Sequence, residues 1–199
     1  SGVDAPRGWQ HSHAVRVPRG MSTGNEQAAD WERQWAGEPL RYDTAEAEAR
    51  TPRWKAQERL VLARFGGFAG LEVIEIGAGR GTNGLLYAER GANVTLLDQA
   101  PLALEQARQI FAARGLPVTT LEADLFDLPA ALLDRFGVSM SFGLCEHFLG
   151  ERRLAVVAAH LGVLHSGGIA MLGVPNRFSP VYRLWIAVLM RRGTWPLGT

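Results

Sequence analysis

Cysteine is almost missing from this sequence, since Cys145 is the only one among 199 residues. A single cysteine excludes an intrachain disulfide and any metal centre built from a cluster of cysteines. We therefore expect a reducing, cytoplasmic location. Cys145 itself is expected to pack as a small apolar side chain.

An excess of charge of one sign is missing as well. The 21 basic and 20 acidic residues leave a formal net charge of +1, and Lys55 is the single lysine. A chain without a strong field gives no reason to expect nucleic acid or an anionic membrane as the main partner. The 47% hydrophobic and 21% charged residues are ordinary for a globular domain.

Long hydrophobic runs are also lacking. Residues 1–20 have no apolar segment of the secretory kind and end in VPRG before Met21, so we interpret them as a vector-derived or disordered leader. The apolar run Leu184–Met190 is too short to span a bilayer. Residues 181–192 are expected to be a helix that packs in the core; a lipophilic substrate, a membrane surface or another subunit are the alternatives. The oligomeric state is not indicated.

Several catalytic signatures do not occur. No group of His, Asp and Glu has metal-ligand spacing, which disfavours a magnesium-dependent mechanism of the catechol type, and we expect no metal. There is no G-x-S-x-G elbow and no phosphate-loop lysine.

What the sequence does contain is an alternation of strands and helices. Strands are predicted at 71–76, 93–98, 117–124, 137–143 and 169–174, and helices at 52–65, 82–90, 101–114, 151–164 and 179–193. This order predicts an α/β fold with a doubly wound, mostly parallel sheet.

Two local details are part of this prediction. The helix at 151–164 is expected to bury one apolar face, made of Leu154, Val157, Leu161 and Leu164. A turn at 167–168 is expected to lead into the fifth strand.

The first strand is followed by a glycine-rich stretch, VIEIGAGRGTNG, with the spacing Glu75-x-Gly77-x-Gly79-x-Gly81. A dinucleotide-binding fingerprint, G-x-G-x-x-G, would place its third glycine at position 82, where this chain has Thr82. The spacing therefore disfavours an NAD(P)-dependent oxidoreductase, which we keep as an alternative.

The pattern acidic-x-G-x-G-x-G after the first strand resembles motif I of the class I S-adenosylmethionine (SAM)-dependent methyltransferases. Further pieces match that superfamily in order: Asp98 at the end of the second strand, EADLFDLP around Asp124, SFGLCEHF after the fourth strand and HSGGIAMLGVPN at the fifth. The resemblance covers residues 52–176. It implies a Rossmann-like fold of the small-molecule methyltransferase type, with SAM as cofactor and S-adenosylhomocysteine (SAH) as its product.

The resemblance also assigns a cofactor site. The implied residues are Glu75, Gly77, Ala78, Gly79, Asp98, Gln99, Asp124, Leu125 and Gly143. Asp98 would hold both ribose hydroxyls, because a carboxylate accepts two hydrogen bonds, and Asp124 would meet the adenine amino group. Glu75 either orients the loop through backbone amides or reaches the methionine amino group.

Simpler interpretations stand beside these. Asp98 can be a helix cap ahead of Pro101, and Asp124 a solvated turn residue. Arg80 is expected to be solvated. Arg53 or Lys55 is a candidate for the cofactor carboxylate.

The acceptor implied by the resemblance is a small molecule, methylated at oxygen or carbon. The superfamily's N-methyltransferase run, Asn/Asp-Pro-Pro-aromatic, is absent at the fourth strand. His147 is the catalytic candidate, because it lies just past that strand; it either takes a proton from a hydroxyl or shapes the pocket. His160 and His165 are expected to be structural. A non-catalytic SAM-binding scaffold is the alternative function.

The same resemblance implies the domain organisation. Residues 21–66 are expected to form an N-terminal helical lid, and residues 67–199 a SAM-binding core. Members of the superfamily continue after the fifth strand with a helix and a hairpin, which this sequence lacks, so we expect the core to be incomplete at its C-terminus. Four aromatic residues of the lid segment, Trp31, Trp35, Tyr42 and Trp54, either line the pocket or serve ordinary helix packing.

Overall fold

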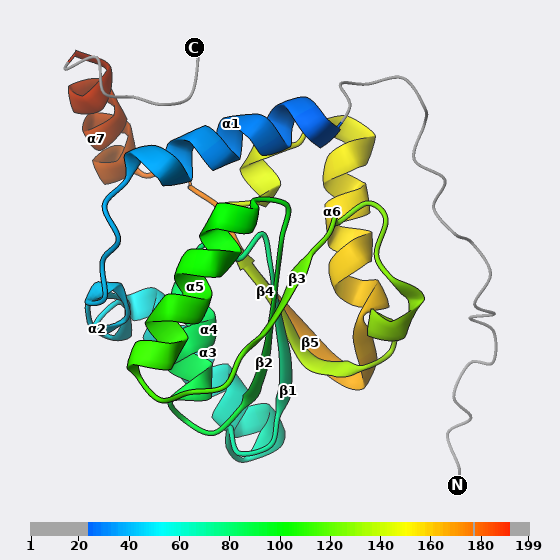
Figure 1. Ribbon diagram of the computed structural model, residues 1–199. Coiled ribbons are helices and arrows are strands. Elements are labelled where there is room, and N and C mark those ends of the chain that lie inside the picture. The colour runs from blue at the N-terminus through cyan, green and yellow to red at the C-terminus, as the bar shows by residue number, and fades with distance from the viewer. Residues whose placement is uncertain (1–23, 177, 192–199) are drawn as a thin grey trace, which may run out of the picture.

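The computed structural model describes residues 24–176 and 178–191, so the predicted leader lies outside the described residues (Figure 1). The strands are β1 (Glu72–Ile76), β2 (Asn93–Asp98), β3 (Thr119–Glu122), β4 (Phe136–Phe142) and β5 (Leu164–Gly173). The α-helices are α1 (Gly24–Gly37), α2 (Thr44–Ala49), α3 (Pro52–Phe65), α4 (Thr82–Ala88), α5 (Pro101–Ala113), α6 (Gly150–Gly162) and α7 (Pro180–Arg191). Two 3₁₀ turns, η1 (Ala130–Leu132) and η2 (Cys145–His147), complete the described elements.

The five strands form one parallel sheet in the order β3-β2-β1-β4-β5. Glu75 of β1 pairs with Leu96 of β2 on one side and with Met140 of β4 on the other. The chain therefore starts in the middle of the sheet and winds outward in both directions. This is the predicted doubly wound α/β architecture, and it confirms the fold class. The strand order reverses between β1 and β4, where such sheets bind ligands.

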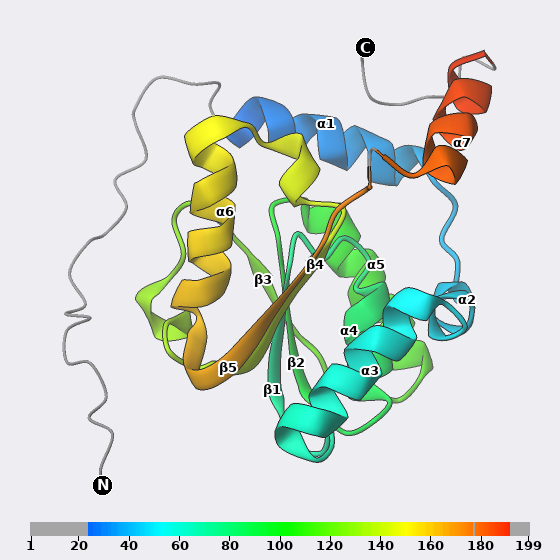
Figure 2. The same cartoon turned by 180° about the vertical axis from the view of Figure 1, so that it is seen from behind.

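Helices cover both faces of the sheet (Figures 1 and 2). On one face α3, α4 and α5 enclose the larger core, which includes Trp54, Tyr87 and Phe111. On the other face η1 and the segments that flank α6 pack on Ile74, Ile76 and their neighbours. The covered faces explain why the strands read as continuous apolar runs.

The ends of α3 follow from local chemistry, as the sequence predicted. Thr51 accepts a hydrogen bond from the Trp54 backbone N–H at 3.1 Å, which caps the first turn. Pro52 occupies the first helical position, where its missing N–H costs nothing. Gly66 ends the helix in the left-handed conformation, with φ 75°.

The buried face of α6 differs from the prediction. Leu154, Val157 and Leu161 are exposed by 70%, 37% and 58%, whereas Val156 and His160 are fully buried. The face toward the sheet includes a polar residue, since His160 Nδ1 lies 2.6 Å from the Ser139 hydroxyl in the middle of β4. The spacing of apolar residues alone therefore predicted the wrong face.

β5 also begins earlier than expected. It starts at Leu164, and the pairing with β4 slips where Phe136 meets Leu164 but Val138 meets Ile169. Gly167, with φ 88°, lies inside this irregular stretch and not in a turn before it. Its carbonyl accepts a hydrogen bond from Arg64 Nε at 2.9 Å, which fixes the irregular stretch to α3.

α7 does not bury the side chains that are described. Leu184, Val188 and Met190 are exposed by 68%, 38% and 47%, so the expectation of a core helix is wrong for this part of α7. Among residues 24–176 and 178–191, none of the helices has the length and apolar character needed to cross a membrane.

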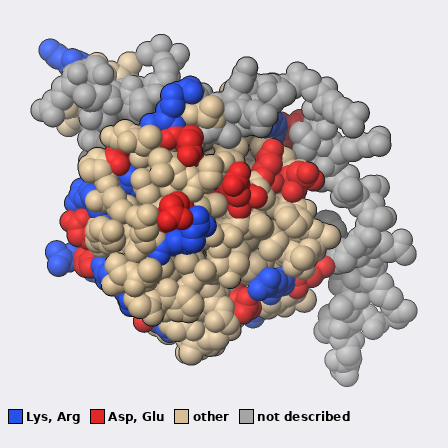
Figure 3. Space-filling view, in the orientation of Figure 1, with Lys and Arg blue, Asp and Glu red and all other residues tan. Residues whose placement is uncertain are grey.

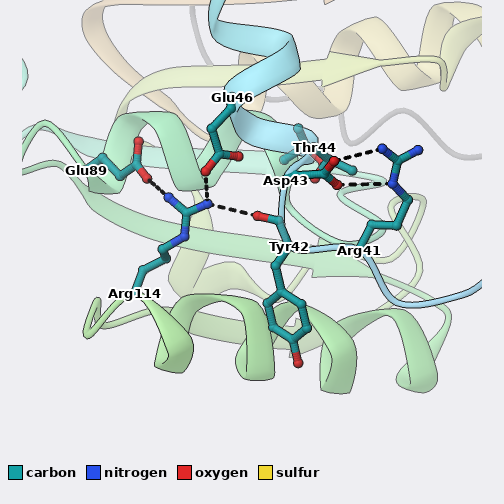
Figure 4. A network of polar contacts seen from close by, with 8 residues as sticks. Arg41, Tyr42, Asp43, Thr44, Glu46, Glu89 and Arg114 are labelled. Atoms are coloured by element: carbon teal, nitrogen blue, oxygen red, sulfur yellow. Dashed lines mark hydrogen bonds and ion pairs between the residues drawn. The ribbon is translucent and has the colours of Figure 1, made fainter.

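The N-terminal segment lies over the body of the domain. α1 crosses above the carboxyl edge of the sheet in both views (Figures 1 and 2). α2 is held by Arg114, which pairs with Glu46 and with Glu89 and donates to the Tyr42 carbonyl at 2.8 Å (Figure 4). On the face seen in Figure 3, acidic and basic side chains are interspersed. The domain boundaries at residues 20 and 66 stay predictions.

Candidate active site

A pocket lies at the carboxyl edge of the sheet, beneath α1. It is lined by residues of α1, of the loop between β1 and α4, and of the segments that follow β2, β3 and β4. Eight of the nine predicted cofactor residues line it: Gly77, Ala78, Gly79, Asp98, Gln99, Asp124, Leu125 and Gly143. The strands after which these residues stand are neighbours in the sheet, which is why distant parts of the sequence meet here.

The glycines of the loop have different surroundings. Gly77 and Gly79 have φ 64° and 52°, a conformation that L side chains rarely adopt. A Cβ at Gly79 would lie 2.6 Å from Trp35 Cζ2, and one at Gly77 would lie 2.7 Å from Leu144 Cδ1. A Cβ at Gly81 would instead meet Leu96 in the core. The first two glycines thus shape the pocket floor, and the third allows α4 to pack.

Asp98 is fixed by backbone donors. Its Oδ2 accepts from the Gly79 N–H at 2.7 Å, and its Oδ1 accepts from the Ala100 N–H at 2.9 Å. The side chain is 9% exposed and faces the pocket. Burial raises the pKa of the carboxyl group, and the backbone N–H donors act against that rise. Each oxygen keeps a lone pair, so the group still can accept from a diol.

Glu75 is the exception among the predicted residues, because it does not line the pocket. It is 4% exposed, and its Oε2 accepts from the Gly84 N–H at 2.8 Å, while Asn83 Nδ2 donates to Oε1 at 3.4 Å. Burial raises the pKa of this carboxyl group to about 7. Of its two interpretations, the geometry favours the one in which it orients the loop and α4.

Asp124 and His147 stand at the ends of β3 and β4. Asp124 Oδ1 accepts from the Phe126 N–H at 2.9 Å, and the side chain is exposed at the pocket wall. The His147 ring lies edge-on to Trp31, with ring centres 4.8 Å apart. His147 therefore reaches the pocket under α1, where a catalytic group would have to stand, and its role stays a prediction.

Helix α1 forms the roof of the pocket, above the carboxyl edge of the sheet (Figure 1). Trp31, Gln34 and Trp35 line the pocket from one face of this helix, at the spacing i, i+3, i+4. Of the other two predicted aromatics, Tyr42 is 46% exposed, and Trp54 is buried in the core against Tyr87. Trp31 and Trp35 therefore line the pocket, Trp54 packs in the core, and Tyr42 fits neither interpretation.

Arg80 is not solvated as expected. It is 8% exposed and donates to the backbone carbonyls of Glu38 and Pro39 at 2.9 and 3.0 Å and to Gln106 Oε1 at 2.7 Å. Its guanidinium carbon lies 5.1 Å from the Trp35 ring centre. Because Arg80 follows Gly79 directly, it fastens the end of α1 to the glycine loop. The only sign of this contact in the sequence was an arginine within the glycine-rich loop.

The remaining candidates divide as follows. Arg53 is paired with Glu48, and its guanidinium carbon lies 4.9 Å from the centre of the Phe142 ring, beside the pocket. Lys55 is exposed and does not line the pocket. Cys145 is 4% exposed among apolar neighbours, which confirms its packing role. No cluster of three or more His, Cys, Asp and Glu suited to a metal occurs in the described part of the chain.

The histidines outside the pocket differ from each other. His160 is fully buried and bonded to Ser139, which confirms a structural role, and His165 is exposed. Sequence reasoning missed one group of lining residues, Phe126, Phe148 and Arg152. The sequence pointed to these residues only weakly. Phe126 and Phe148 are aromatic residues that follow two strands, and Arg152 is an arginine in the first turn of the next helix.

The family model and the curated sequence relatives that match this chain are methyltransferases. A protein-family model described as "Methyltransferase domain" matches residues 73–168. A 2-methyl-6-phytyl-1,4-hydroquinone methyltransferase of Oryza sativa subsp. japonica, a chloroplastic protein, is 39% identical over 105 residues, which are 52% of this chain and 30% of that protein. A ubiquinone biosynthesis O-methyltransferase of Pseudomonas aeruginosa (strain UCBPP-PA14) is 29% identical over 136 residues, 64% of this chain and 57% of that protein.

The solved structures include one reported for the conversion of a disulfide bond into a thioacetal group during echinomycin biosynthesis. It superposes with a TM-score of 0.66 at 27% identity and covers 87% of this chain and 71% of that chain. The described chain thus spans less than two thirds of both sequence relatives but most of this structural one.

Proposed function

We propose that the protein is a class I SAM-dependent methyltransferase and transfers a methyl group from SAM to an oxygen or carbon atom of a small-molecule acceptor. The match of residues 73–168 to a methyltransferase-domain model supports this proposal. The observation that carries the proposal is the position of Asp98. Its buried carboxylate faces the pocket at the end of β2 and is bonded to the backbone of the glycine loop.

The residues present fit the cofactor. The pocket floor has two glycines in conformations that exclude side chains, and acidic groups follow both β2 and β3. Asp98 would hold the ribose hydroxyls, and Asp124 with the backbone of Leu125 would hold the adenine. SAM supplies an activated methyl group on a sulfonium, which leaves to the protein the alignment of the acceptor.

The acceptor side is formed by α1 and η2. Trp31 and Trp35 line the pocket from α1. His147 is placed to accept the proton of an acceptor hydroxyl, with its ring position set by Trp31. The printed names of the two sequence relatives, a hydroquinone methyltransferase and an O-methyltransferase, support methylation at oxygen or carbon. A cytoplasmic location belongs to the proposal and is supported by the single cysteine.

The first prediction concerns Asp98 and the cofactor. Titration calorimetry of the full chain should show binding of SAM and SAH and no binding of NADH. Asp98→Ala should weaken SAH binding about tenfold or more, because a charge-assisted hydrogen bond contributes roughly 1.5–3 kcal/mol. Asp127→Ala is the matched control, since Asp127 is exposed and does not line the pocket.

Binding of NADH without SAH would refute the proposed function. Unchanged SAH affinity in Asp98→Ala would refute the ribose assignment alone. SAH binding with no SAH released from SAM across a panel of phenols and enols would favour the non-catalytic scaffold.

A further inference from the structure

The pocket contains a cation that the cofactor assignment does not use. Arg152, in the first turn of α6, is the only arginine or lysine among the lining residues. No hydrogen bond or ion pair joins it to any residue in the ranges 24–176 and 178–191. Asp98 and Asp124, the acidic side chains of the same pocket, accept backbone N–H groups instead.

Two phenyl rings hold this arginine in place. Its guanidinium carbon lies 4.6 Å from the centre of the Phe126 ring and 5.6 Å from that of Phe148, and the two rings meet edge to face at 5.1 Å. These contacts are cation–π interactions, which attract the guanidinium to the rings. Arg152 is therefore packed against the pocket wall by aromatic contacts.

The next residue shows the contrast. Arg153 donates to the carbonyls of Cys145 and Phe148 at 3.2 and 2.8 Å, so its role is to secure the turn after β4. Arg152 Nε is buried without a partner, and its terminal nitrogens are not among the buried unpartnered atoms, so they remain accessible. A cation that is partly desolvated and unpaired gains more from an anion than a fully hydrated one.

The chemistry of the ligand follows from these surroundings. The planar end of a guanidinium matches a carboxylate, to which it can donate two parallel hydrogen bonds. Aromatic side chains of Trp31, Trp35 and Phe142 line the same pocket, and such a lining suits a flat ring. We propose that the methyl acceptor is an aromatic acid whose carboxylate is bound by Arg152. This inference rests on the proposed function.

The experiment compares an acid with its neutral amide. With the full chain saturated with SAH, titration calorimetry measures the binding of 2-naphthoate and of 2-naphthamide. We expect the naphthoate to bind about tenfold more tightly, as a charge-assisted hydrogen bond predicts. Arg152→Gln should reduce this difference to about twofold or less and leave the SAH affinity within about threefold. Arg108→Gln is the control, because Arg108 is paired with Glu105 on the surface.

Each other outcome overturns the inference. Equal binding of acid and amide, or no saturable binding of the naphthoate, would show that the pocket does not select an aromatic acid. A tenfold loss of SAH affinity in Arg152→Gln would assign Arg152 to the cofactor. If that variant fails to fold, Arg152→Lys and the wild-type comparison decide, because Lys keeps the charge and loses the fork. Failure of the proposed function is distinguishable, since wild-type protein would then not bind SAH.

Discussion

The Asp98 carboxylate connects three parts of the site. It receives the Gly79 N–H from the glycine loop and the Ala100 N–H that precedes α5, and it faces the pocket. The sequence offered a ribose contact and a helix cap as alternatives. The N-cap of α5 is Ala100 and no side chain caps this helix, so Asp98 is not its cap, and the ribose contact stays a prediction.

At the same scale, His160 makes stability depend on pH. Burial lowers the pKa of His160 to about 4 from an ordinary value of 6.5. Between these values the unfolded chain binds a proton that the folded chain does not, so this residue destabilises the fold as pH falls from 6.5 to 4. The full effect is about 3 kcal/mol, at roughly 1.4 kcal/mol per pKa unit. Urea unfolding at pH 7 and pH 5 should show the loss.

His160→Asn isolates this contribution, since its amide can replace the Nδ1 contact with Ser139 and does not titrate. A variant is needed because Glu75 acts in the opposite direction: its raised pKa, about 7, stabilises the fold at low pH, and that contribution is lost as pH rises from 4.5 through 7. We expect the stability gap between wild type and variant to change between pH 7 and pH 5. A constant gap would contradict the prediction.

At the scale of elements, α1 is the part most dependent on a few contacts. Arg80 holds its C-terminal end, and the Glu32 carboxylate accepts the Leu102 N–H at the start of α5. Trp35 packs on Gly79 in the same place. The roof of the pocket is thereby joined to the loop that forms its floor, so ordering of one supports ordering of the other.

Replacing Arg80 should loosen this roof. In Arg80→Ala we expect faster hydrogen exchange in residues 29–38 and SAH affinity lowered about tenfold, because buried charge-assisted hydrogen bonds to carbonyls are lost. Hydrogen exchange with mass spectrometry and calorimetry measure the two effects. Arg41→Ala, which removes an exposed pair with Asp43, should change neither. If hydrogen exchange in α1 is as slow in Arg80→Ala as in the wild type, the hydrogen bonds of Arg80 are not needed to hold this helix.

Helices α3 and α6 differ in how well the sequence predicts them. The bounds of α3 were predictable because Thr51, Pro52 and Gly66 act locally. The orientation of α6 was not, because its buried face includes His160, whose partner Ser139 lies 21 residues away in the sequence. The spacing of apolar residues gives no information about a polar residue that faces the core.

At the scale of the whole molecule, the order of strands and helices was enough to predict the sheet and the edge at which the pocket lies. Eight of nine predicted cofactor residues meet there, because the ends of neighbouring parallel strands meet by construction of the fold. The group of Phe126, Phe148 and Arg152 was not predictable, since these residues come together only through packing between separate segments.

Cofactor binding should stabilise the whole domain. A ligand that binds only the folded state adds about 2.7 kcal/mol at a concentration of 100 times its Kd. For a chain of this length, that corresponds to a rise in Tm of roughly 5–10 °C. Differential scanning calorimetry with and without SAH measures it, and Asp98→Ala at the same SAH concentration should show a smaller rise. An equal rise in both proteins would place the bound SAH elsewhere.

The two roof tryptophans give the protein an optical reporter of its own. Trp31 and Trp35 face the pocket, while Trp54 is 1% exposed inside the core. Emission from the first two should respond to whatever enters the pocket, and emission from Trp54 should stay constant as an internal reference. Ligand entry can therefore be followed by fluorescence in the unlabelled protein. Because the chain has six tryptophans, Trp31→Phe and Trp35→Phe are needed to assign the change to the pocket.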